Sequence, residues 1–198
     1  MKKPVKNYNL KNLNVLIVEK LPAMRNMFVG VLRQLGVKDI RDAPTPDKGF
    51  EMLRDKPADL IFTDWGPAFN GIKLLFKIRK DPDSPDPYVA VIMVTACTEL
   101  QEVITARDAG ITEFLAKPVS VESLYERICS VIESHRVFIR SRDFVGPDRR
   151  RRSMDYGGSE QRTHSNISGF DRRVRGRSFS GQNRRLMLYG RETAVAPK

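Results

Sequence analysis

The stretch Leu60-Ile61-Phe62-Thr63-Asp64 places an acidic residue just after a short, solid apolar run. Two similar runs occupy residues 15–18 and 89–94, and all three are too short to be independent helices. Such runs are typical of strands that are covered on both faces, as in a parallel sheet. We therefore expect Asp64 to lie at the carboxyl end of a central, buried strand.

The segments between these runs show the three-to-four spacing of amphipathic helices. Pro22 would begin the first helix and Gly36 would end it, Thr45-Pro46 would begin the second, and Ser120 would cap the last. With weaker strands near residues 37–41 and 113–116, the alternation predicts an α/β fold with a doubly wound, five-stranded parallel sheet. Two apolar stripes at helical spacing support this prediction, one of Met24, Met27, Val31 and Leu35 and one of Leu124, Ile128 and Ile132. A capping box is predicted at Thr98–Gln101.

Polar residues follow the predicted strands at the edge where a parallel sheet binds ligands. They are Glu19 and Lys20, Asp64, Thr95 and Lys117. A carboxylate flanked by an ammonium and a hydroxyl can accept a phosphoryl group, because its neighbours balance the added charge. The alternative is that these are ordinary polar residues at strand ends.

In order and spacing, several motifs together resemble the receiver domain of two-component response regulators. The resemblance runs from about Asn14 to Ser134 and implies the CheY-like, flavodoxin-like sheet order 2-1-3-4-5. The motifs are the run 15–18 with its polar pair, Phe62-Thr63-Asp64-Trp65, Asn70-Gly71, Val94-Thr95-Ala96 and Phe114-Leu115-Ala116-Lys117-Pro118.

The resemblance implies a role for each matching position. Asp64 would be the phosphoacceptor, attacking the phosphohistidine of a histidine kinase or phosphotransfer protein. Lys117 would bind the phosphoryl oxygens, and its bond to Pro118 would be cis. The switch and phosphoryl-binding positions would also include Thr95, Ala96 and Phe114. The signal would pass to a downstream protein target. The resemblance also allows a homodimer.

Two departures from the family pattern concern its Mg²⁺ site, for which the resemblance implies Glu19, Asp64 and the backbone of Gly66 as ligands. The usual second acid is replaced by Lys20, whose ammonium cannot ligate a cation, and the loop after Asp64 is one residue shorter. Lys20 would either pair with Asp64 or extend into solvent. The chain is thus either a phosphorylated regulator with weakened or absent Mg²⁺ binding, or a phosphorylation-independent pseudo-receiver acting as an adaptor.

The charge distribution divides the chain into an N-terminal extension (1–12), a receiver domain (13–135) and a basic tail (136–198). The tail holds 16 Lys and Arg against 6 Asp and Glu, is rich in Gly and Ser, and is predicted to be disordered. A loose unit of aromatic, Gly, acid or amide, and Arg recurs in residues 144–150, 156–162 and 179–185. The candidate binding residues of the tail are Arg149, Arg150, Arg151, Arg152, Arg172, Arg173, Arg184 and Arg185.

Two kinds of partner remain for this tail. Docking to a protein is favoured over binding to nucleic acid through stacked aromatics and guanidinium groups. The simplest alternative is a solvated tail whose aromatics anchor it to its own receiver domain or to an acidic protein. No helix-turn-helix pattern is readable. No nucleophile–base set is visible around His135 or His164, so an enzyme is not expected beyond self-phosphorylation and slow self-dephosphorylation. The polar start and the lack of a long apolar run lead us to expect a cytoplasmic protein without a membrane span, and the family resemblance implies a bacterial one.

Overall fold

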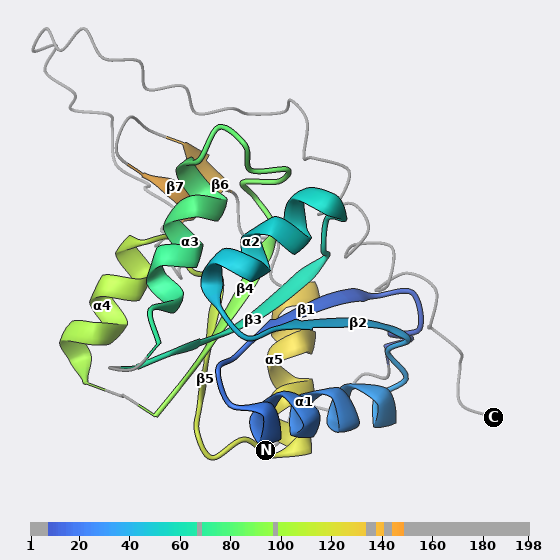
Figure 1. Ribbon diagram of the computed structural model, residues 1–198. Helices are drawn as coiled ribbons and strands as arrows, with labels where there is room; N and C mark the ends of the chain where they lie inside the picture. The colour runs from blue at the N-terminus through green and yellow to red at the C-terminus, as the bar shows by residue number, and fades with distance from the viewer. Residues whose placement is uncertain (1–7, 67–68, 97–98, 134–137, 141–143, 149–198) are drawn as a thin grey trace, which may run out of the picture.

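The computed structural model describes residues 8–66, 69–96, 99–133, 138–140 and 144–148. A five-stranded parallel sheet in the order β2-β1-β3-β4-β5 forms its centre (Figure 1). This confirms the predicted fold class and strand order. The strands are β1 (Asn14–Val18), β2 (Asp39–Ala43), β3 (Leu60–Trp65), β4 (Ala90–Thr95) and β5 (Glu113–Ala116).

Helices cover both faces of the sheet, α1 and α5 on one and α2, α3 and α4 on the other (Figure 1). Alternate residues of each strand face opposite helical layers. In β1, Val15 and Ile17 pack with Phe28 of α1, whereas Leu16 and Val18 pack in the layer of α2 and α3. The helices are α1 (Pro22–Gln34), α2 (Pro46–Asp55), α3 (Gly71–Lys80), α4 (Leu100–Asp108) and α5 (Val121–Glu133).

Most of the predicted helix ends are confirmed by their capping contacts. The Thr45 side chain accepts a hydrogen bond from the Lys48 backbone N–H at 3.2 Å, and Ser120 Oγ accepts one from the Ser123 N–H at 3.1 Å. Gly36 follows α1 with φ +90°, a conformation that favours glycine. The predicted capping box was wrong: α4 has Glu99 as its N-cap, without a side-chain capping bond, and Thr98 lies outside the described residues.

The edge strand β2 begins two residues later than expected. Val37, which suggested the strand, is buried in the turn before it, and pairing with β1 starts at Asp39. Because β2 has a neighbour on one side only, its charged residues stay partly exposed and its sequence lacks a solid apolar run. Sequence pattern therefore located this strand less well than the central ones.

Two short strands, β6 (Phe138–Arg140) and β7 (Val145–Pro147), form an antiparallel pair after α5. The pair, orange in Figure 1, lies beside the carboxyl end of α3. It falls in the range assigned to the tail, because strands of three residues show no readable periodicity. Residues 149–198, with all eight candidate arginines, lie outside the described residues, as do Cys97, His135 and His164.

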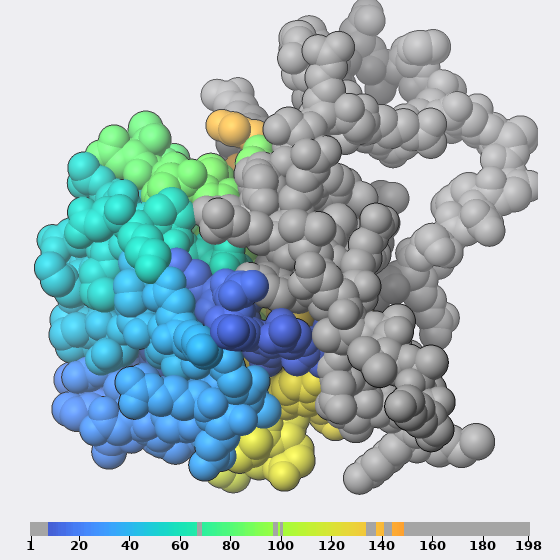
Figure 2. Space-filling view, turned by 90° about the vertical axis from the view of Figure 1, so that its right-hand side faces the viewer, coloured from blue at the N-terminus to red at the C-terminus, as the bar shows by residue number. Residues whose placement is uncertain are grey.

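Part of the predicted N-terminal extension packs on the domain. Leu10 is buried in the layer of α1 and α5, and Tyr8 Oη donates to Glu133 at 2.7 Å. Figure 2 looks onto the side where β1 to β3 begin, and there the dark blue atoms of this segment lie beside those of α1, β2 and α2. None of the helices in the described ranges is long and apolar enough to cross a membrane.

Candidate functional site at the carboxyl ends of the strands

Three charged side chains meet where β1, β3 and β5 end. The Lys117 ammonium lies 2.8 Å from Asp64 Oδ1 and 3.2 Å from Glu19 Oε2. Glu19 is only 2% exposed, and its other carboxylate oxygen accepts the backbone N–H of Leu21 at 2.9 Å. The side chain of Asp64 is 16% exposed, so it is the carboxylate of the pair that solvent reaches.

The two carboxylates change the proton affinity of Lys117. Burial alone would lower its pKa, but hydrogen bonding to Asp64, the charge of Asp64 and then the contact with Glu19 together raise the pKa above its ordinary value. Lys117 therefore keeps its positive charge near Asp64. Its peptide bond to Pro118 is cis, as the resemblance implied.

Thr95 connects the end of β4 to both neighbouring strands. Its hydroxyl donates to the backbone oxygen of Trp65 at 2.8 Å, and its own carbonyl accepts the N–H of Lys117 at 2.9 Å. Since Trp65 follows Asp64 directly and pairs with Thr95 across the sheet, these contacts tie Asp64, Thr95 and Lys117 into one strand edge.

The loop after Asp64 is tight and leads straight into α3. Gly66 and Phe69 exchange two backbone hydrogen bonds, at 3.1 and 3.0 Å. Asn70 then caps α3 by accepting the Lys73 N–H at 3.0 Å. A Cβ atom on Gly71 would overlap the backbone oxygen of Asp64, so only glycine lets the helix begin this close to the acceptor.

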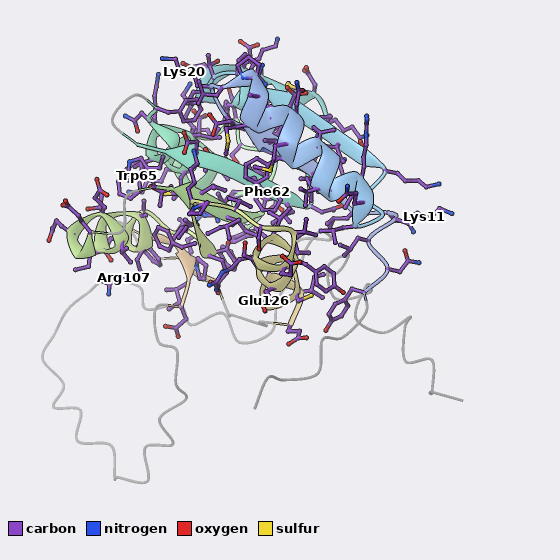
Figure 3. The ribbon with its side chains drawn as sticks, turned by 90° about the horizontal axis from the view of Figure 1, so that it is seen from below. Lys11, Lys20, Phe62, Trp65, Arg107 and Glu126 are labelled. Atoms are coloured by element: carbon purple, nitrogen blue, oxygen red, sulfur yellow. The ribbon has the colours of Figure 1, made fainter. Side chains whose placement is uncertain are left out.

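Lys20 lies at the same rim as Trp65, whereas Lys11 lies at the opposite end of the sheet (Figure 3). The Lys20 side chain is exposed, and the described ion pair of Asp64 is with Lys117. Of the two alternatives for Lys20, extension into solvent is the one observed. Its backbone oxygen accepts Arg25 Nη1 at 2.9 Å.

The two remaining predicted switch positions are Phe114, in β5, and Ala96, directly after β4. Phe114 is half-buried and packs at the margin of the α2–α4 layer, with Trp65 as another member of that margin. Ala96, directly after β4, is exposed. No bulky side chain at position 96 therefore closes the approach to this edge.

Arg25 is a structural part of the site that sequence reasoning missed. Its Nη1 donates to the backbone oxygens of Glu19 and Lys20, while its Nε pairs with Asp42 at 2.8 Å. The guanidinium therefore holds the β1–α1 turn in place. No local motif could reveal it, because Arg25 lies in α1 and its partner Asp42 lies in β2.

A comparison with known families shows to which family the chain with this edge belongs. The family model of the response regulator receiver domain matches residues 15–129, more than half of the chain. The chain belongs to the response regulator receiver family. Receiver domains are signalling modules of two-component systems that receive a phosphoryl signal, and they are generally not enzymes. CheY-like receivers interact with histidine kinases and downstream targets.

Individual receivers resemble the chain over the same part. Chemotaxis protein CheY-3 of Vibrio cholerae is 32% identical over 124 residues, covering 62% of this chain and 94% of that protein. CheY of Pseudomonas aeruginosa is 31% identical over 122 residues, covering 61% and 97%. A CheY-like receiver structure from Methanospirillum hungatei has a TM-score of 0.53 at 26% identity, covering 60% and 91%. Each alignment leaves more than a third of this chain outside.

Receiver domains commonly bind Mg²⁺ at the acidic positions of this edge. Here the donor set is Glu19 and Asp64, both already bound by the Lys117 ammonium, with the cationic Lys20 beside them. The Gly66 carbonyl, the implied backbone ligand, accepts the Phe69 N–H at 3.0 Å. The described residues contain no group of three or more His, Cys, Asp or Glu that could hold a metal. This donor set does not fit a hard divalent cation, because the two carboxylates already contact an ammonium and the second acid of the usual pair is replaced by a cationic Lys20.

Proposed function

We propose that this receiver accepts a phosphoryl group on Asp64 and relays the signal through protein–protein contacts. An Asp64 carboxylate oxygen attacks phosphorus in the phosphohistidine of a histidine kinase or phosphotransfer protein. The P–N bond breaks, its electron pair returns to the imidazole nitrogen, and an acyl phosphate forms. Water later attacks phosphorus, which releases inorganic phosphate and restores the carboxylate. The observation that carries the proposal is the Asp64–Lys117 contact of 2.8 Å at a solvent-reached strand end.

The neighbours of Asp64 support this chemistry by charge and by hydrogen bonding. The Lys117 ammonium would stay with the phosphoryl oxygens, where its charge stabilises the transition state. The Thr95 hydroxyl, now bound to the Trp65 carbonyl, would turn to the phosphoryl group and draw its loop inward. Phe114 would then fill the space that the loop leaves. The change of surface would be read by a downstream protein.

The test is phosphoryl incorporation into the full chain from acetyl phosphate or a cognate kinase, with and without Mg²⁺. We expect one phosphoryl group, detected by intact mass, in the wild type and in Asp47→Asn, and none in Asp64→Asn. Asp47 is the matched control, because it is a surface carboxylate that also pairs with lysines, Lys73 and Lys77. Absence of incorporation from every donor would refute the proposal.

A second candidate function, a pseudo-receiver that signals by contact alone, is favoured by the same departures that disfavour Mg²⁺. With Lys20 in place of an acid and Lys117 already bound to both carboxylates, the edge is charge-balanced without a phosphoryl group or a metal. Such a domain would bind its partners equally well as wild type and as Asp64→Asn. A partner that distinguishes phosphorylated from unphosphorylated chain would exclude this candidate.

We further propose that the basic tail is a docking segment for an acidic protein partner. Its net charge is +10, and each repeated unit pairs an aromatic residue with Arg and with an acid or amide. Acidic residues within the units weaken the attraction to a phosphate backbone, which favours protein over nucleic acid.

A further inference from the structure

Arg79, in the last turn of α3, is a fully buried arginine that the proposed chemistry does not use. Its Nε donates to the Gly110 carbonyl at 3.0 Å, and its Nη1 donates to the carbonyls of Pro87 and Val89 at 2.7 and 2.9 Å. Burial lowers its pKa, opposed by the charge of Asp86. Arg79 is only 2% exposed and its hydrogen bonds go to backbone oxygens. Burying its charge is therefore costly unless a further favourable contact offsets the desolvation.

The strand β6 supplies the cover that removes Arg79 from water. The guanidinium lies over the ring of Phe138, 5.3 Å from its centroid, and Tyr88 meets the same ring edge-on at 5.6 Å. A guanidinium over a ring face is an attractive arrangement, and it is stronger where water is excluded. Phe138 therefore closes the Arg79 site from a segment that follows α5.

The strand β7 makes a second close contact with the domain. Gly110, in the turn between α4 and β5, has φ +92°, and a Cβ there would overlap the Val145 backbone oxygen. A Cβ on Gly146 would come within 2.6 Å of Gly110 Cα. Two glycine backbones thus lie directly against each other. The Arg79 side chain and the Gly110 turn are joined by their hydrogen bond, and together they contact both strands of the β6–β7 pair.

The helix that carries Arg79 begins at the phosphoacceptor. Gly71 lies against the Asp64 carbonyl at one end of α3, and Arg79 lies in the last turn at the other. Between them Leu74, Leu75 and Ile78 are at most 1% exposed, so α3 is closely packed along its buried face and transmits strain as a stiff element. A displacement at its first residue therefore reaches Arg79.

We infer that the strand pair β6–β7 forms a clasp on the domain, closed by Arg79 and Phe138, and that α3 links this clasp to the state of Asp64. The inference rests on the proposed phosphorylation of Asp64. A phosphoryl group on Asp64 moves the start of α3, and the three Arg79 hydrogen bonds, all to segments outside α3, lengthen. The clasp then loosens and releases the origin of the C-terminal segment toward its partner.

The experiment is amide hydrogen exchange of the full chain, read by mass spectrometry in peptides spanning residues 138–147, before and after treatment with acetyl phosphate. We expect phosphorylation to speed exchange in the clasp by about fivefold, the lower range of allosteric couplings. Asp64→Asn, treated identically, should not change. Phe138→Ala should exchange fast in both states, whereas Ile139→Ala, the outward neighbour that is 41% exposed, should respond as wild type does.

The outcomes separate the two proposals. A chain that gains one phosphoryl group with unchanged exchange in residues 138–147 overturns the link through α3 and leaves phosphorylation intact. Slow exchange in Phe138→Ala overturns the clasp itself. A chain that gains no phosphoryl group refutes the proposed function and removes the regulated state of the clasp with it.

Discussion

Lys117 is the residue on which the electrostatics of the site depend, since its ammonium contacts both Asp64 and the buried Glu19. Its raised pKa means that the folded state holds this proton more tightly than the unfolded chain does. The resulting stability is fully present below the ordinary lysine pKa of 10.5 and is lost as pH rises through the higher folded value.

We predict that Lys117→Met lowers the free energy of unfolding by about 2 kcal/mol at neutral pH, because two carboxylates lose their shared cation. The difference from wild type should begin to shrink above pH 10.5 and disappear as pH rises through the higher pKa of the folded state, where Lys117 of the wild type loses its charge. Urea unfolding followed from pH 7 to pH 11 measures it. Lys11→Met, an exposed lysine at the far end of the sheet, serves as control and should show little difference at any pH. A pH-independent deficit in Lys117→Met would contradict the argument.

We propose that Lys20 is the main obstacle to Mg²⁺ binding at this edge. We predict that Lys20→Asp creates Mg²⁺-dependent quenching of Trp65, the single tryptophan of the chain, because a third carboxylate then joins Glu19 and Asp64. Lys11→Asp makes the same charge change far from the site and should show no quenching (Figure 3). An unchanged fluorescence titration of Lys20→Asp would mean that Lys20 is not the obstacle to binding.

Both ends of α3 make contacts that its own sequence does not explain. Its first residue lies on the Asp64 carbonyl and its last turn holds the clasp. The turn between α4 and β5 completes this second contact through Gly110. The clasp is therefore bound by two elements of the domain at once.

Two glycines with nearly equal φ offer a matched test of the clasp. Gly36 and Gly110 have φ of +90° and +92°, but a Cβ has open space at Gly36 and would overlap the Val145 oxygen at Gly110. Gly36→Ala should cost about 1 kcal/mol of unfolding free energy, from backbone strain alone. We predict that Gly110→Ala costs about 1 to 3 kcal/mol more, from overpacking against β7. Equal losses in urea unfolding would show that β7 is not seated on Gly110.

For the molecule as a whole, the proposed signalling edge and the clasp lie at opposite ends of α3. The described chain after β7 thus begins at the end of α3 that is away from Asp64. Charge also divides the sequence into two parts, a nearly neutral domain and a tail of net charge +10.

We predict that the full chain does not shift random single-stranded DNA or RNA in electrophoresis at moderate salt, since we propose that the tail docks to protein. Should a shift appear, binding through Arg–phosphate contacts would weaken steeply as salt rises, with roughly tenfold to thousandfold loss between low and physiological salt. A salt-dependent shift that disappears when residues 149–198 are removed would overturn protein docking in favour of nucleic acid.

Much of the fold could be predicted from local pattern. The solid runs that became β1, β3 and β4, the Pro and Ser/Thr signals at helix starts, and Gly36 all act within a few residues, so the sequence displays them directly. The polar residues after the strands could also be found, since parallel strands end at one edge. The edge strand β2 and the start of α4 were placed less well, because weak or ambiguous local signals were settled by packing.

The amino-acid sequence alone was thus enough to predict the α/β alternation, the polar residues at the strand ends and the division of charge. Which side chains meet there depended on long-range packing. The pairing of Lys117 with both Asp64 and Glu19, the hold of Arg25 on the β1–α1 turn, and the burial of Arg79 under Phe138 each join residues from separate elements. Such contacts form only when folding brings distant segments together, so no local periodicity records them.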